Sequence, residues 1–193
     1  MITNKSSLKE WLDYEKNKYN VRSGFVGFLY YLVGSEQAVI WSSQKRLRIT
    51  EYYYNTHKRM RYIFSMVLLN HKKNKYGIRI GLNICDKGLK IMHLGSILMN
   101  GNTRIGRDVA IHINTSFVAP GMNSFAPTVG NGVVIGVGAT LIGGITIADY
   151  VAIGANSVVC KSISEKNIAV AGNPARKVSN NGNLAWMKAQ GIM

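Results

Sequence analysis

Apolar residues recur at every sixth position through the second half of the chain, in the series Val129, Ile135, Leu141, Ile147, Ile153 and Val159. An α-helix turns once in 3.6 residues, so a period of six would not keep one helical face apolar. A flat strand alternates every two residues and gives no reason for Gly130, Gly136 and Gly154, which directly follow three of the apolar positions. The pattern therefore predicts a solenoid of short parallel strands, in which one residue on each flat side points into a shared core.

The same period extends upstream through Ile105, Ile111 and Phe117. Twelve residues separate Phe117 from Val129, and within this gap residues 119–124 have the composition of a loop that leaves the coil. The step from Ile97 to Ile105 is eight residues, so the first coil is expected to be irregular. Because loops on a rigid scaffold commonly form binding sites, we expect the substrate site near these two irregularities.

The N-terminal part of the chain has a helical pattern instead. Apolar residues follow helical spacing from Leu8 to Tyr19, and a second helical stretch is expected over about residues 36–70. After the solenoid, residues 184–187 are expected to form one helical turn that covers its open end. We divide the chain into a basic α-helical region (1–75), a β-helix (76–178) and a C-terminal tail (179–193).

Composition and charge narrow the class of protein. The chain has 193 residues, of which 47% are hydrophobic and 17% are charged, as in globular domains. Residues 24–34 form an apolar run about half the ~20 residues that a membrane helix needs. No signal-peptide pattern opens the chain, so a cytoplasmic protein is expected.

The formal net charge is +15, and much of it lies in the helical region. Nine basic residues there share about thirty positions with a single acid, Glu51: Lys45, Arg46, Arg48, Lys58, Arg59, Arg61, Lys72, Lys73 and Lys75. This charge suits nucleic acid, an anionic membrane surface, or an anionic small molecule or glycan, and equally a solvated helical face.

Two segments carry a family resemblance. The sequences IGANSVVCK (153–161) and AVAGNPARKV (169–178) resemble the end of the solenoid in hexapeptide-repeat acyltransferases, and the likeness covers about residues 77–178. The resemblance implies a left-handed parallel β-helix, a homotrimer with active sites between subunits, and acetyl-CoA as cosubstrate. Residues 88–112 are similar to serine acetyltransferases, and more so to their short relatives found with capsule and surface-polysaccharide genes.

Two histidines of the solenoid are candidates for the catalytic base. Imidazole titrates near neutral pH, and the resemblance matches His93 to the catalytic histidine of serine acetyltransferases. His93 and His112 are nineteen residues apart and a coil is about eighteen, so they are expected on neighbouring coils and the same side. We expect His93 to be the base and His112 to orient it, bind the acceptor, or serve as the base itself.

The carboxylate partner of this base stays open. Asp86 and Asp108 are the nearest acids in sequence, and a backbone carbonyl is the alternative partner for the imidazole. Positions where the resemblance implies acidic or basic groups around the substrate hold other residues here: Ile78 or Arg79, Met92, Phe125 and Ala126. The groups that would hold serine are therefore expected to be missing, which favours a sugar hydroxyl as acceptor.

Five residues are expected to hold the cosubstrate. Val137 and Ala155 are eighteen residues apart, so they should stack on successive coils, and the resemblance places their backbone along the pantetheine arm. It places Cys160, Lys161 and Arg176 at the adenine and phosphate end, where fixed cations suit phosphates. The solenoid holds two histidines rather than the three of a zinc site, so no metal is expected.

We conclude from the sequence that the chain is an acetyl-CoA-dependent O-acetyltransferase. The predicted acceptor is a saccharide hydroxyl in capsular or other surface-polysaccharide synthesis, with direct transfer in a ternary complex. The basic region would hold the protein at the inner face of the membrane. One alternative is a small-molecule acetyltransferase acting on serine or a nucleotide sugar. Another is a non-catalytic scaffold whose basic region binds membrane or nucleic acid, against which Lys161 and Arg176 argue; nucleic acid is not an expected partner.

Overall fold

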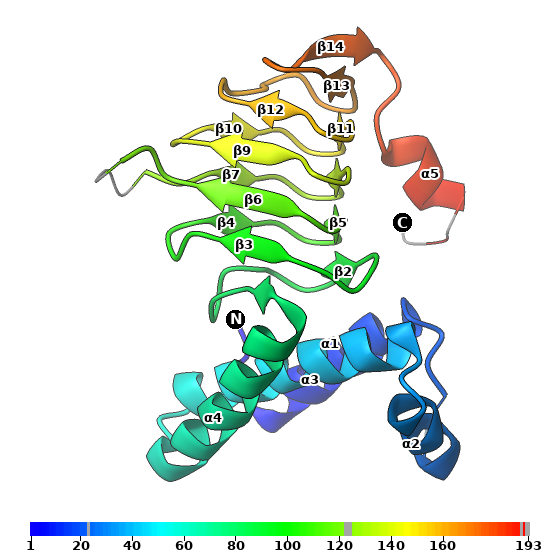
Figure 1. The fold of residues 1–193 in the computed structure, drawn as a ribbon, viewed down its shortest axis with the longest axis vertical. Helices are drawn as coiled ribbons and strands as arrows, with labels where there is room; N and C mark the ends of the chain where they lie inside the picture. The colour runs from blue at the N-terminus through cyan, green and yellow to red at the C-terminus, as the bar shows by residue number, and fades with distance from the viewer. Residues whose placement is uncertain (23, 122–124, 190, 192–193) are drawn as a thin grey trace.

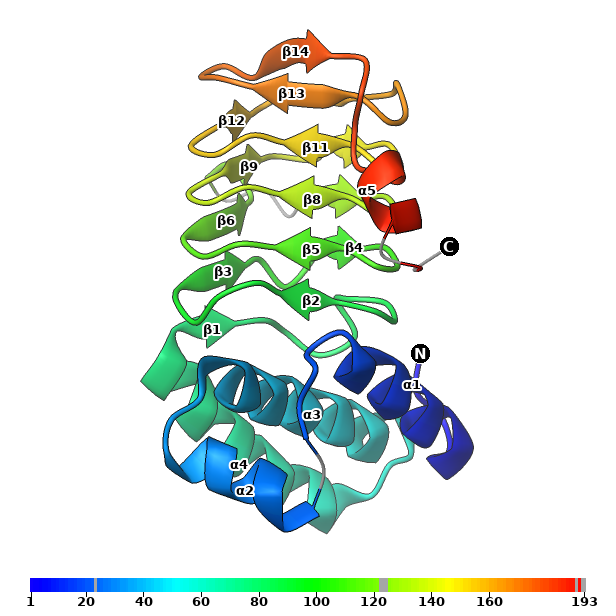
Figure 2. The same ribbon diagram turned by 90° about the vertical axis from the view of Figure 1, so that its right-hand side faces the viewer.

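A computed structural model describes residues 1–22, 24–121, 125–189 and 191. A layer of four helices lies at one end, and an upright solenoid stands on it (Figures 1 and 2). The helices are α1 (Lys5–Asn17), α2 (Gly24–Leu32), α3 (Glu36–Asn55) and α4 (Arg59–Tyr76). The helical stretch expected over about residues 36–70 consists of two helices, α3 and α4, and His57 adopts a left-handed φ of 54° in the turn between them.

The strands of the described residues form three sheets that make the sides of the solenoid. The five-stranded sheet contains β1 (Ile78–Arg79), β3 (Ile97–Met99), β6 (Thr115–Val118), β9 (Thr140–Ile142) and β12 (Val158–Val159). The three-stranded sheet contains β4 (Arg104–Ile105), β7 (Thr128–Val129) and β10 (Thr146–Ile147). The six-stranded sheet contains β2 (Lys90–Ile91), β5 (Ala110–Ile111), β8 (Val134–Ile135), β11 (Ala152–Ile153), β13 (Ala169–Ala171) and β14 (Arg176–Ser179).

The six-residue period is the core of this solenoid. Thr140 pairs with Val158, eighteen residues later, so three six-residue steps make one coil. The six residues of the series starting at Val129 are all at most 3% exposed. Stacked coils therefore bury one apolar side chain per side, and the hydrophobic effect stabilises the stack. The predicted fold class, a left-handed parallel β-helix with an α-helical N-terminal region, is confirmed.

One coil is longer than the others. Ser116 of β6 pairs with Thr140 of β9, twenty-four residues later rather than eighteen. The six extra residues lie between β6 and β7, in the stretch where the sequence predicts a loop at 119–124. Residues 122–124 of that loop lie outside the described residues.

The prediction that the tail covers the open end of the solenoid is wrong. The short helix α5 (Leu184–Ala189) lies along the side of the coils, while β14 closes the end by pairing antiparallel with β13 (Figures 1 and 2). Asn183 Nδ2 donates to the Gly132 carbonyl at 2.8 Å, and Met187 is buried against the coil. Gly132 has a φ of +63°, and a Cβ there would lie 2.6 Å from the Met187 sulfur, so this contact requires glycine.

Buried polar contacts attach the helical layer to the first coil. Arg48 of α3 is fully buried and donates to Glu15 of α1 at 2.7 Å and to Glu51 at 2.9 Å. The same guanidinium donates to the carbonyls of Cys85 and Asp86 at 2.8 and 2.9 Å. Burial alone would lower the pKa of Arg48, but the two carboxylates more than offset it and raise the pKa. Helix α3 is therefore held in a fixed position on the solenoid.

The exposed part of the helical layer is apolar and basic. Helix α2 has no buried residue, and Phe25 and Leu32 are 73% and 60% exposed. In the part of the chain that the structure describes, no helix has the length and apolar character to cross a bilayer.

Candidate active site

The two solenoid histidines lie side by side on neighbouring coils. His93 follows β2 and His112 follows β5, which pair in the six-stranded sheet with Ile91 opposite Ile111. Their ring centroids are 5.8 Å apart with an angle of 36° between the ring planes. The nineteen-residue spacing thus brings two imidazoles to one edge of the solenoid, as the sequence predicts.

A carboxylate from the helical layer reaches this pair. Glu36 lies in the first turn of α3, and its Oε1 accepts a hydrogen bond from the Leu94 backbone N–H at 2.8 Å. Its Oε2 is 3.4 Å from Nδ1 of His93. Glu36 was not predicted from the sequence, because it is fifty-seven residues from His93 and belongs to a different structural region. Its one visible signal is its position in the first turn of a helix whose other charged residues are mostly basic.

The two imidazoles differ in their surroundings. The His93 side chain is 54% exposed, which leaves the ring open to a substrate. His112 is more enclosed, and its buried Nδ1 has no hydrogen-bond partner among the described residues. Burial, and to a lesser extent the neighbouring His93, lower the pKa of His112 below its ordinary value. The neutral form of His112 is therefore favoured.

The two acids considered from the sequence do not partner either histidine. Asp108 accepts from Lys18 Nζ at 2.6 Å and from the Tyr14 hydroxyl at 2.8 Å, so it joins α1 to the solenoid. Burial and this hydrogen bond raise the pKa of Tyr14 to about 12. Asp86 is exposed and accepts from the backbone N–H of Lys87 at 2.7 Å. Both acids have structural roles, because the turn positions that they occupy face the helical layer or solvent.

Val137 and Ala155 lie on the same edge as the histidines. They follow β8 and β11, the next two strands of the six-stranded sheet after β5. The backbone N–H of Asn156 donates to the Val137 carbonyl at 2.7 Å, which fixes the two corners against each other. A Cβ on Gly136 would lie 2.7 Å from the Ala155 nitrogen, so the close approach of these coils depends on glycine. The edge therefore runs from the histidines to two small or apolar residues.

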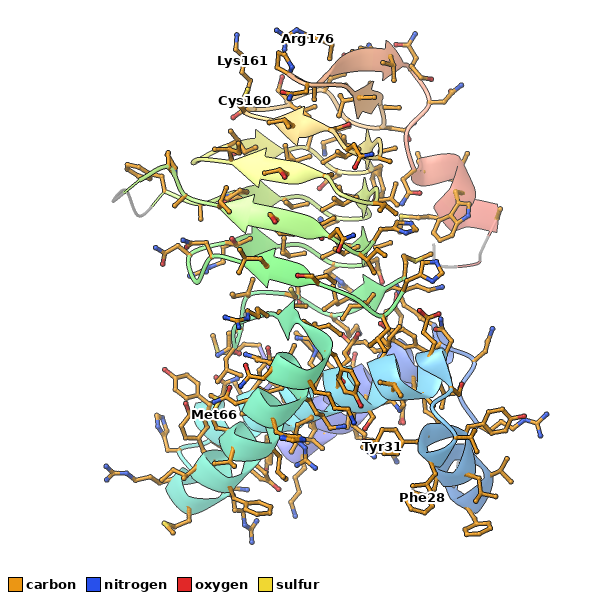
Figure 3. The ribbon with its side chains drawn as sticks, in the orientation of Figure 1. Phe28, Tyr31, Met66, Cys160, Lys161 and Arg176 are labelled. Atoms are coloured by element: carbon orange, nitrogen blue, oxygen red, sulfur yellow. The ribbon has the colours of Figure 1, made fainter. Side chains whose placement is uncertain are left out.

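Cys160, Lys161 and Arg176 gather at the far end of the solenoid, as Figure 3 shows. All three line one open hollow between the turn after β12 and the start of β14. Neither Val137 nor Ala155 lines this hollow. The structure therefore brings the expected cosubstrate residues together as two groups on different parts of the end coils. Among the described residues, no group of three or more metal-binding side chains is placed to hold a metal ion.

Comparisons with known proteins identify the class. No protein-family model matches the chain. The serine acetyltransferase of Helicobacter pylori is 35% identical over 127 residues, which cover 64% of this chain and 73% of that protein. A serine acetyltransferase structure in complex with cysteine superposes with a TM-score of 0.72 at 26% identity, over 91% of this chain and 71% of that one. Another, in complex with CoA, has a TM-score of 0.70 at 24% identity, over 90% and 71%.

The solenoid with paired histidines on one edge is that of a hexapeptide-repeat acyltransferase. Within that class, the chain belongs to the serine acetyltransferase family.

The predicted saccharide acceptor is wrong, because the relatives and structures named above are serine acetyltransferases. They agree with the small-molecule alternative. The prediction relied on missing charges at positions such as Met92 and Phe125 in the solenoid. The structure brings the carboxylate of Glu36 from the helical layer to the site, so an acid that is absent from those solenoid positions is present in the site.

Proposed function

We propose that this protein transfers the acetyl group of acetyl-CoA to the hydroxyl of serine. The observation that carries the proposal is the His93–His112 pair on the solenoid edge, with Glu36 beside it. A 35% identical relative is a serine acetyltransferase, which supports serine as the acceptor.

In this proposal His93 is the general base. Its exposed ring takes the proton of the serine hydroxyl while the oxygen attacks the thioester carbonyl. The bond from carbon to sulfur then breaks, its electron pair stays on sulfur, and the imidazolium of His93 returns the proton to give the CoA thiol. The lowered pKa of His112 favours its neutral form, which does not repel the imidazolium that forms on its neighbour.

Acetyl-CoA is the cosubstrate, as expected from the sequence and supported by the CoA complex of a similar protein. The two corner residues, Val137 and Ala155, would lie along its pantetheine arm. Lys161 and Arg176 line an open hollow with exposed cationic groups that suit phosphates. Cys160 lies in the same hollow and would contact the adenine end.

The activity is tested with purified full-length protein, acetyl-CoA and L-serine. We expect serine-dependent release of free thiol and formation of O-acetylserine, measured by a thiol reagent and by mass spectrometry. Calorimetric titration with acetyl-CoA accompanies the assay. Tight acetyl-CoA binding with no product from serine would refute serine as the acceptor, and no acetyl-CoA binding would favour the scaffold alternative.

The role of the histidines is tested by substitution. His93→Ala should lower kcat by about 10²–10⁴-fold, the usual contribution of a general base. His112→Ala should lower kcat less, because no carboxylate among the described residues contacts His112. A larger loss of kcat in His112→Ala than in His93→Ala would show that His112, rather than His93, is the general base.

The cation hollow is tested through the Michaelis constant. Lys161→Ala and Arg176→Ala should each raise KM for acetyl-CoA by about tenfold, with little change in kcat, because each removes one charge-assisted phosphate contact. Lys188→Ala in α5 is the matched control and should leave KM unchanged. An unchanged KM in both Lys161→Ala and Arg176→Ala would show that the phosphates of acetyl-CoA do not bind in this hollow.

The homotrimer and the peripheral membrane contact stay predictions. Light scattering of the full-length protein measures the first, and a trimer mass is expected. Flotation with anionic vesicles measures the second, and the exposed apolar α2 within a basic region supports it.

A further inference from the structure

Glu36 makes two different contacts with its two carboxylate oxygens. Oε1 accepts from the backbone N–H of Leu94 at 2.8 Å, and Oε2 faces Nδ1 of His93 at 3.4 Å. The first contact anchors the carboxylate to the solenoid backbone and directs the second oxygen at the ring. This is the arrangement expected of an acid that orients an imidazole.

Helix α3 holds the carboxylate in this position. Gln44, eight residues further along α3, donates to the Leu89 carbonyl at 2.8 Å, and Arg48 donates to the carbonyls of Cys85 and Asp86. These bonds tie the helix to the coil that leads into β2 and His93. The acid therefore comes from the helical region, but its position is set by the solenoid.

No other carboxylate in the described part of the chain contacts His93. Asp108 is held by Lys18 and Tyr14, and Asp86 by the backbone of its neighbour. The ionisable groups that contact His93 are Glu36 from α3 and His112 from the next coil. Glu36 is thus the carboxylate placed to accept a hydrogen bond from the His93 ring.

We propose that Glu36 is the positioning residue of His93: it accepts the Nδ1–H hydrogen bond, so that Nε2 is free to take the proton of the acceptor hydroxyl. This proposal rests on the proposed function for the identity of the acceptor. Its claim about the tautomer of His93 does not depend on that function. The proton moves from the hydroxyl to Nε2 and then to the thiolate, as above.

The variant Glu36→Gln tests this with a clear structural consequence. The backbone N–H of Leu94 is a donor, so we expect the amide oxygen of the new side chain, and not its NH₂ group, to keep this hydrogen bond. The amide NH₂ then faces Nδ1 of His93, and this nitrogen must become the acceptor. The proton moves to Nε2, the nitrogen that the mechanism needs free.

The first measurement is the tautomer of His93, read from the ¹⁵N imidazole shifts of labelled full-length protein above pH 8. His93→Asn assigns the signal. We expect the Nδ1–H form in the natural protein and the Nε2–H form in Glu36→Gln. Asp13→Asn, an exposed acid of α1, is the control and should keep the Nδ1–H form. This measurement needs no substrate, so it tests the role of Glu36 at His93 even if serine is not the acceptor.

The second measurement is kinetic. Glu36→Gln should lower kcat by about 10–100-fold, less than the 10⁴-fold loss for a fully buried acid, because this pair is half exposed. KM for serine should change little, and Glu36→Asp should restore part of kcat. An unchanged tautomer in Glu36→Gln would overturn the proposal. A higher KM for serine with kcat retained would also overturn it, since Glu36 would then bind the acceptor instead.

Discussion

The solenoid and the helical region are stabilised by different kinds of contact. In the solenoid, Ile135 and Ile153 fill equivalent places on successive coils, Leu141 fills the corresponding place on another side, and each is at most 3% exposed. In the helical region, the contact with the solenoid centres on a buried cation, Arg48, between the carboxylates of Glu15 and Glu51.

The two regions therefore differ in whether their contacts repeat along the chain. A solenoid contact joins residues eighteen positions apart and recurs, so each coil repeats the same packing. A contact such as Arg48 with Glu15 or Glu36 with His93 occurs once, between distant residues. The solenoid holds the two histidines of the site, and the helical region provides the carboxylate of Glu36.

Arg48→Ala should produce the largest loss of stability. It leaves Glu15 and Glu51 buried without their cation, and breaking a buried ion pair in this way costs about 3–5 kcal/mol. Urea denaturation of the full-length protein measures the free energy of unfolding. Lys45→Ala, an exposed position on the same helix, should change it by at most about 0.5 kcal/mol. Equal effects of the two substitutions would show that the polar junction does not hold the helical region.

Leu141→Ala should destabilise the solenoid by about 3 kcal/mol, through lost apolar burial and the cavity that remains. Leu141 is fully buried between coils, whereas Leu98 of β3 is 44% exposed. Leu98→Ala is therefore the matched control, and a change below about 1 kcal/mol is expected there. The same urea titration measures both, and similar losses would contradict the assignment of Leu141 to the core.

The pH dependence of stability should show the smallest effect, and it comes from His112. Its pKa is lower in the folded protein than in the unfolded chain, so between these two values the unfolded state binds more protons. Stability therefore falls as pH drops from the ordinary histidine value of about 6.5 through the folded value. Urea unfolding measured between pH 8 and 5 should show that the free energy of unfolding depends less steeply on pH in His112→Gln than in the natural protein. The same pH dependence in both proteins would be evidence against this role of His112.

The repeating coils of the solenoid were predictable from the sequence, and the contacts that occur only once were not. The six-residue period predicts the coils and places His93 and His112 together, because residue spacing converts directly into position within a regular stack. Glu36 was missed because no period relates α3 to the solenoid. The placement of α5 along the side was also missed, since it depends on contacts that belong to this segment alone, such as the bonds from Asn183 to Gly132 and Tyr150 and the burial of Met187.

A double-mutant cycle tests most directly whether the two regions form one catalytic unit. The value of kcat/KM for serine is measured in the natural protein, Glu36→Gln, His93→Ala and the double variant. If Glu36 acts through His93, Glu36→Gln lowers kcat/KM by about 10–100-fold alone and has no further effect once His93 is absent. The same fold loss in both backgrounds would contradict the account, because Glu36 would then act independently of His93.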